Sequence, residues 1–363
     1  MSTCSQGEGT KMPRDGLDGK QMASGKRTTI YDLAELAGAS PTAVSSVLNG
    51  TWRKRRIGPA LAEKIIRLAD EQGYSVNMQA SGLSREKSNL IGMIVPKYDN
   101  RYFGSIVEKF EAMARERGLF PIITCTQRDA ELEIQAAREM ISHQVNYLIS
   151  TGATDPDRIT EICAAAGVRT LNLDLPGKLA PSVISDNRGG ARELTRRILE
   201  ASGARRAASE PLLFVGGRPT DHNTIERIKG FRDAHSELGI AVGDGHILAN
   251  GYAAEKARRA LDAYLESGHK SPNALFVSST ITLEGVVQWI DANPAYADAR
   301  PHIGCFDLDP MVSALDKKIL MLRQDVPRML ETLFDMIDGK IDAVGVVEMP
   351  TALVHDDPFS STD

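Results

Sequence analysis

The spacing of hydrophobic residues predicts the first folded stretch of the chain. They recur at every third or fourth position, as on one face of a helix, at Ile30, Leu33, Ala34 and Ala37. Thr29 can cap the start of this helix, and Gly38 suits its end because glycine tolerates a left-handed backbone. Ser40 and Pro41 are typical first residues of a second helix, whose apolar stripe is Ala43, Val44, Val47 and Leu48. Two short helices joined by a tight turn predict a helix-turn-helix unit.

A third helix is predicted to begin at Pro59 and to end at Gly73, with an apolar face made by Leu61, Ile65, Leu68 and Ala69. Between the second and third helices, Trp52 is followed by four consecutive cations, Arg53, Lys54, Arg55 and Arg56. Adjacent cations of this kind are not buried, so the loop is either simply solvated or placed against phosphates. Trp52 either packs against the third helix or lies along a sugar.

The polar face of the second helix has an unusual composition. Its predicted outward residues are short and able both to donate and to accept hydrogen bonds: Thr42, Ser45, Ser46 and Asn49. A surface helix that needs only solubility usually carries Glu and Lys. Short side chains let the backbone approach a base edge or a phosphate closely. Taken alone, the pattern fits a DNA-reading helix and a generic two-helix hairpin equally well.

From Leu90 onwards, short apolar runs alternate with amphipathic stretches. The predicted strands are 90–95, 120–125, 145–150, 170–174, 212–216, 246–248, 274–278 and 302–307. The predicted helices are 103–117 and 132–143, with four more that begin at Gly190, Asn223, Ala253 and Leu283. Such alternation is typical of βα units and parallel sheets. The units are too many for one compact sheet, so we expect two Rossmann-like lobes.

Polar residues follow several of these predicted strands. Ligands of parallel α/β sheets bind outside the carboxyl ends of the strands. Each residue alone would be a simple strand-end cap, but together they are expected to converge on a cleft. They are Tyr98, Asp99, Asn100, Arg101, Asp174, Arg218, Asp221, Ser279, Thr280 and Asp307.

The net charge of −5 hides an asymmetry along the 363 residues. Residues 26–87 carry ten Lys or Arg against six Asp or Glu, whereas residues 88–363 carry 30 against 39. A basic segment attached to an acidic body suits a DNA-binding module joined to a part that does not touch DNA. The first 25 residues are rich in Gly, Ser and charge and show no periodic pattern, which predicts a disordered tail.

The sequence gives little support to chemistry other than binding. Cys4, Cys125, Cys163 and Cys305 are far apart, so no zinc or redox spacing is present. No membrane span, secretory signal or glycine-rich nucleotide motif is found. We therefore expect a cytoplasmic, nucleoid-associated protein with no cofactor, metal or membrane partner. A cytoplasmic sugar-metabolising enzyme resembling a sugar dehydrogenase is the alternative.

The stretch Thr-Thr-Ile-Tyr-Asp-Leu-Ala-Glu-Leu-Ala-Gly-Ala-Ser at 28–40, with Val-Ser-Ser-Val-Leu-Asn-Gly at 44–50, closely resembles the DNA-binding head of the lactose/galactose repressor family, LacI/GalR. The resemblance implies an all-α helix-turn-helix DNA-binding head. It also implies an α/β two-lobed effector domain with parallel Rossmann-like sheets, like that of type I periplasmic sugar-binding proteins. The implied protein is a homodimeric transcriptional regulator, a repressor, that binds double-stranded operator DNA and responds to a sugar or sugar phosphate.

The resemblance also implies domain boundaries. The expected segments are a tail at 1–26, the head at 27–74, a hinge helix or linker at 75–88, the effector-binding and dimerisation domain at 89–357 and a tail at 358–363. Within the effector domain, the N-lobe is expected at about 89–187 and 325–342, and the C-lobe at about 188–324 and 343–357.

Two sets of site residues follow from the same resemblance. The DNA-binding set is Thr29, Ser40, Pro41, Thr42, Ser45, Ser46, Asn49, Arg53, Lys54, Arg55, Arg56, Asn77, Ala80 and Leu83, of which Leu83 matches the family's minor-groove wedge. For the effector, the resemblance points to Asp174, Arg227, Asp307 and Gln324. The strand-end residues Tyr98, Asn100, Arg101, Arg218 and Ser279 complete the expected effector-binding set. The family's usual Asn-Asp pair is replaced by Ser279-Thr280, a departure that resembles the fructose/sucrose-repressor branch.

Overall fold

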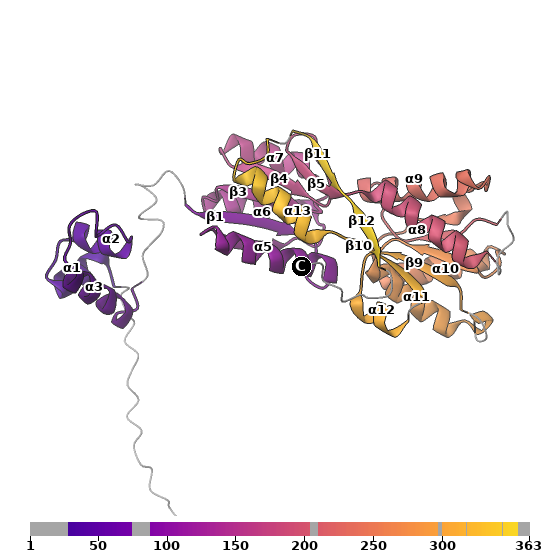
Figure 1. The fold of residues 1–363 in the computed structure, drawn as a ribbon, viewed down its shortest axis with the longest axis horizontal. Coiled ribbons are helices and arrows are strands. Elements are labelled where there is room, and N and C mark those ends of the chain that lie inside the picture. Colours follow the sequence, from indigo (N-terminus) through magenta and orange to yellow (C-terminus); the bar gives the residue numbers. More distant parts are fainter. Residues whose placement is uncertain are drawn as a thin grey trace, which may run out of the picture. The chain divides into compact units, whose positions relative to one another are not determined.

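The computed structural model describes residues 28–74, 88–203, 210–296, 300–316, 318–342 and 344–354. They form two compact units, a helical head before residue 75 and a larger α/β body after residue 87 (Figure 1). Among the described residues, no helix is long and apolar enough to cross a membrane.

The head consists of α1 (Ile30–Ala37), α2 (Pro41–Leu48) and α3 (Pro59–Glu71). Thr29 forms a capping box with Asp32, and Gly38 ends α1 with a φ of 66°. The core of the head is Leu33, Ala34, Ala37, Val44, Val47, Ala62, Ile65 and Ala69. Trp52 is partly buried and packs against this core, which agrees with its expected packing inside the head. The predicted helices of the head are therefore confirmed.

The body contains two six-stranded sheets, and each defines a lobe. The N-lobe sheet has the order β11-β5-β4-β3-β1-β2 and is parallel throughout. Its strands are β1 (Leu90–Val95), β2 (Phe120–Cys125), β3 (Tyr147–Thr151), β4 (Arg169–Leu173), β5 (Ser182–Ser185) and β11 (Val346–Met349). Its helices are α5 (Arg101–Glu116), α6 (Ala130–Ser142), α7 (Pro156–Ala165) and α13 (Val326–Ile337).

The C-lobe sheet has the order β12-β10-β9-β8-β6-β7, and only the pairing of β10 with β12 is antiparallel. Its strands are β6 (Leu213–Val215), β7 (Ile247–Leu248), β8 (Ala274–Val277), β9 (His302–Phe306), β10 (Ile319–Gln324) and β12 (Thr351–Val354). The helices of this lobe are α8 (Asn187–Ser202), α9 (His222–Glu237), α10 (Ala254–Glu266), α11 (Thr280–Ala292) and α12 (Pro310–Leu315). The two parallel Rossmann-like sheets expected from the sequence are therefore confirmed.

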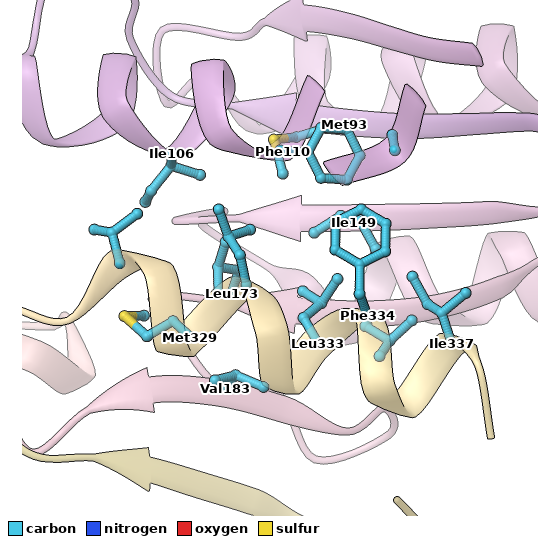
Figure 2. Close-up of a cluster of buried hydrophobic side chains, with 14 of the residues drawn as sticks. Met93, Ile106, Phe110, Ile149, Leu173, Val183, Met329, Leu333, Phe334 and Ile337 are labelled. Atoms are coloured by element: carbon cyan, nitrogen blue, oxygen red, sulfur yellow. The ribbon is translucent and has the colours of Figure 1, made fainter. Parts of the chain in front are cut away.

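A helix from late in the chain completes the core of the N-lobe. Figure 2 shows α13 lying against the N-lobe sheet and α5, with Leu333 and Phe334 pointing toward Phe110 and Ile149. The rings of Phe110 and Phe334 stack with centroids 5.6 Å apart. Because α13 follows directly after β10 of the other lobe, the chain is tied across both lobes at this point.

The chain passes between the two sheets three times: between β5 and α8, between β10 and α13, and at Pro350 between β11 and β12. The third passage differs from the expected boundary. Residues 343–349 were expected in the C-lobe, but Val346–Met349 pairs in parallel with β5 of the N-lobe sheet. Pro350 has no N–H to donate to a sheet, and it separates β11 from β12, two strands that belong to different sheets.

Candidate DNA-binding face and effector cavity

Capping residues fix the start of each helix in the helix-turn-helix of the head. Oγ of Ser40 accepts a hydrogen bond from the Ala43 N–H at 3.1 Å, and Pro41 is the first residue of α2. Thr29, Ser40 and Thr42 are exposed, while Pro41, Ser45 and Asn49 are partly exposed. The amide of Asn49 donates to Oγ of Ser45 at 3.2 Å, which links two of the polar side chains on α2. These two residues therefore present one joined set of hydrogen-bonding groups.

Ser46 does not belong to this exposed set, and its expected outward position is wrong. Its side chain is 6% exposed, and its Oγ donates to the Thr42 carbonyl at 2.8 Å. The segment after α2 turns back onto this position, because the Thr51 N–H donates to the Ser46 carbonyl at 2.9 Å. Ser46 therefore supports the structure of α2 and does not face outward.

The four cations at 53–56 are all exposed and lie in a turn between α2 and α3. The guanidinium of Arg53 lies over the Trp52 ring at 5.1 Å, so the partly buried tryptophan anchors the start of the loop. A cationic loop fixed beside α2 is well suited to contact phosphates. The other expected DNA contacts, Asn77, Ala80 and Leu83, lie outside the described residues.

In the body, a cavity of about 250 Å³ opens among the strand ends of both sheets. Seven of the nine residues expected to bind an effector line it: Asn100, Asp174, Arg218, Arg227, Ser279, Asp307 and Gln324. Tyr98 and Arg101 do not. Tyr98 is exposed in the turn after β1, and Arg101 points to Asp309, with Nε 3.4 Å from Oδ2. Both were predicted to bind an effector because they follow a strand in the sequence. In the structure, their side chains point away from the cavity.

Asp174 follows β4 in the N-lobe and is buried. Its Oδ1 accepts hydrogen bonds from the Tyr102 hydroxyl and the Asn223 amide, both at 3.1 Å. Burial raises the pKa of this carboxyl, and the guanidinium groups of Arg128 and Arg227 oppose the shift. Since Asn223 belongs to α9, its hydrogen bond to Asp174 joins the two lobes across the cavity.

Asp307 follows β9 in the C-lobe and is also buried. The side-chain amide of Gln324 donates to its Oδ1. Burial raises the pKa of Asp307 to about 7, against the opposing effect of Arg227. Oε1 of Gln324 in turn accepts a hydrogen bond from the Ser185 hydroxyl of the N-lobe at 2.6 Å. This network also crosses between the lobes.

Arg227 is 3% exposed and is held from several directions. Its Nε donates to Oδ1 of Asn187 at 2.8 Å, and its Nη1 donates to the Ser278 carbonyl at 2.6 Å. The guanidinium also lies over the Phe306 ring at 3.7 Å. Asn187 donates to Asn223 at 3.0 Å, which connects Arg227 to the Asn223–Asp174 bond. Such a fixed, planar group can offer its remaining donors to adjacent hydroxyl oxygens.

Several cavity residues were not predicted: Lys97, Tyr102, Phe103, Gln127, Arg128, Leu175, Asn223, Tyr252, Lys256 and Ile281. Gln127 and Arg128 could have been found by the strand-end rule, because they follow the predicted strand 120–125. Both have positive φ, at 54° and 59°, an uncommon backbone conformation for such residues. Tyr252 follows β7 in the same way. Tyr102 and Phe103 lie inside α5 and gave no comparable signal.

The cavity is a hydrogen-bonding site. Carboxylates, amides, hydroxyls and guanidinium groups line it together with the Phe103 and Tyr252 rings. The described residues contain no group of three or more His, Cys, Asp or Glu side chains suited to hold a metal ion. Donors and acceptors that converge in a largely buried cleft suit a small molecule with many hydroxyl groups.

Comparisons with known proteins agree with this architecture. Residues 91–337 match the family model of the periplasmic binding protein domain. The chain is 63% identical over 193 residues to the ribitol operon repressor of Klebsiella aerogenes, covering 53% of this chain and 72% of that relative. It is 28% identical over 326 residues to the sucrose operon repressor of Klebsiella pneumoniae, covering 87% and 93%.

Among solved structures, the lac repressor dimer bound to operator and an anti-inducer superposes with a TM-score of 0.73. That match has 21% identity and covers 91% of this chain and 98% of the other, and it shows a common fold. The two curated relatives are operon repressors, so the dehydrogenase alternative finds no support. The chain belongs to the lactose/galactose repressor family of DNA-binding transcriptional regulators.

Proposed function

We propose that this protein is an operon repressor whose cavity binds a neutral polyol of the ribitol class. The 63% identity to the ribitol operon repressor, over about half of this chain, carries this proposal. A pentitol has a hydroxyl on each of its five carbons, so it needs many donors and acceptors and few apolar contacts. Asp174, Asp307, Arg227 and Gln324 would provide them, with the Phe103 ring against the carbon chain.

We further propose that two copies of the chain act together on operator DNA. Each head would read one half of a pseudo-palindromic site through α2, with the loop at 53–56 against phosphates. Ser45 and Asn49 are the proposed base-reading side chains, because they are accessible and joined to one another. Leu83, with Asn77 and Ala80, is proposed to contact the minor groove between the two heads.

Control by the effector would operate through the two lobes. The Asn223–Asp174 and Ser185–Gln324 hydrogen bonds join the lobes at the cavity, so a ligand held there favours one lobe arrangement. A change in that arrangement would alter the spacing of the two heads and weaken operator binding. Couplings of this kind amount to about 1–3 kcal/mol.

Thermal unfolding of the full chain tests the effector assignment. Ribitol at about 100 times its Kd should stabilise the protein by about 2.7 kcal/mol, and glucose should not. The stereoisomeric pentitols xylitol and arabinitol measure how strictly the cavity reads hydroxyl geometry. Stabilisation by glucose with no response to any pentitol would contradict the proposed effector class.

A further inference from the structure

Asp221 is the N-cap residue of α9, yet its side chain does not cap the helix. Five other helices in the described body begin with an aspartate whose carboxylate accepts a backbone N–H: Asp129, Asp155, Asp186, Asp309 and Asp325. Capping by Asp typically contributes about 1 kcal/mol, so the different orientation of Asp221 indicates a competing interaction.

That interaction is with two arginines of the cavity. Oδ2 of Asp221 accepts a hydrogen bond from Nε of Arg218 at 3.0 Å and lies 3.4 Å from Nη1 of Arg128. Arg218 and Asp221 follow β6 in the C-lobe, whereas Arg128 follows β2 in the N-lobe. The Arg128 and Asp221 side chains are only 16% and 10% exposed. One carboxylate thus bridges two guanidinium groups of different lobes inside the cavity.

The Arg128 guanidinium has contacts besides Asp221, and the Arg218 guanidinium keeps donor capacity that Asp221 does not use. Arg128 lies over the Phe103 ring at 5.7 Å and the Tyr252 ring at 5.4 Å, and its backbone has positive φ. Nη2 of Arg218 is buried with no hydrogen-bond partner among the described residues. Two guanidinium groups converging on one point are well suited to bind a phosphate or carboxylate.

We propose that Asp221 determines the specificity of the cavity by occupying this anion position with its own carboxylate. An uncharged polyol can bind beside the bridged arginines. A ligand that carries a phosphate cannot use them, and its charge is repelled by the carboxylate of Asp221. The inference rests on the proposed polyol effector and adds to it the rejection of phosphorylated polyols.

The test is calorimetric titration of the full chain with ribitol and with ribitol 5-phosphate. The wild-type protein should bind ribitol and should bind the phosphate at least tenfold more weakly. Asp221→Asn removes the charge while keeping the shape, so its affinity for ribitol 5-phosphate should rise by about tenfold or more, as expected for a new charge-assisted hydrogen bond. Asp221→Ser, a neutral residue that also suits an N-cap, should show the same gain.

The matched control is Asp233→Asn, which removes a carboxylate on the same helix, α9, paired with Arg188 at 2.7 Å outside the cavity. This control should keep the wild-type preference. Adding Arg218→Gln to Asp221→Asn should abolish the gain, because one of the two guanidinium groups is then lost. Thermal melting without ligand verifies that each variant is folded.

The possible results distinguish a failure of the proposed role of Asp221 from a failure of the proposed polyol effector. Ribitol binding by the wild type, with no gain of phosphate affinity in either Asp221 variant, would overturn the inference alone. Wild-type affinity for ribitol 5-phosphate equal to or above that for ribitol would also overturn it. Binding of neither compound by any variant would overturn the proposed polyol effector and the inference together.

Discussion

Asp174 and Asp307 occupy matching positions in the two lobes. Each is the residue directly after a parallel strand, β4 in one sheet and β9 in the other. Each is buried with a positive φ, 71° for Asp174 and 148° for Asp307, in a region that non-glycine residues rarely adopt. Both carboxyl groups line one cavity, and the charge of Asp174 adds to the rise in the pKa of Asp307. Strained backbone and buried charge at the same two positions are typical of a binding site.

The first prediction concerns pH. Burial raises the pKa of Asp307 from its usual 3.8 to about 7, so between these values the folded protein holds a proton that the unfolded chain has lost. The stability from this group is fully present below pH 3.8 and is lost as the pH rises through about 7. Urea unfolding across this range should show the wild type losing stability relative to Asp307→Asn. A pH-independent difference would contradict the raised pKa.

The second prediction separates two adjacent serines of α2. Ser45→Ala should weaken specific operator binding by roughly 1 kcal/mol, about fivefold, because it removes an accessible hydroxyl and the partner of Asn49. Ser46→Ala should leave operator affinity within about twofold, since its hydroxyl is buried against the Thr42 carbonyl. Binding curves with labelled operator measure both. A larger loss for Ser46→Ala than for Ser45→Ala would show that Ser46 contacts DNA.

The third prediction concerns the cationic loop. Replacing Arg53 and Lys54 by Gln should weaken binding to all DNA sequences alike, because phosphate contacts carry no sequence information. In a dimer up to four contacts are lost, and the slope of log K against log salt should flatten by about 0.9 for each. Arg259→Gln, an exposed cation of α10 in the body, is the control. An unchanged slope in the double variant would mean that the loop does not contact phosphates.

Much of this architecture could be predicted from the sequence. The bounds of strands 90–95 and 120–125 are predicted correctly at both ends. A short apolar run between turn residues is best explained as a buried strand. The strand Ser182–Ser185 was missed, since four residues with two serines carry almost no apolar signal. The division at Pro350 was missed as well, because which sheet a strand joins depends on tertiary pairing.

The sequence predicts those site residues whose position depends on the fold of one lobe only. The strand-end rule found Asp174, Arg218 and Asp307. It does not predict side-chain direction, so it also selected Tyr98 and Arg101, which turn out of the cavity. The interactions that join the lobes, such as Arg128 with Asp221, depend on two segments far apart in the sequence. Ser46 was misplaced because its hydroxyl bonds to the Thr42 carbonyl of its own helix, which helical spacing alone does not reveal.

Binding of a polyol in the cavity is proposed to release operator DNA from the head. Fluorescence anisotropy of labelled operator, titrated with ribitol, measures this coupling directly. Ribitol should release the operator from the wild-type protein. The variant Arg227→Lys should need at least about tenfold more ribitol, because the donors of a planar guanidinium are lost. Operator that stays bound at saturating ribitol, or that is released equally from both proteins, would contradict effector control through this cavity.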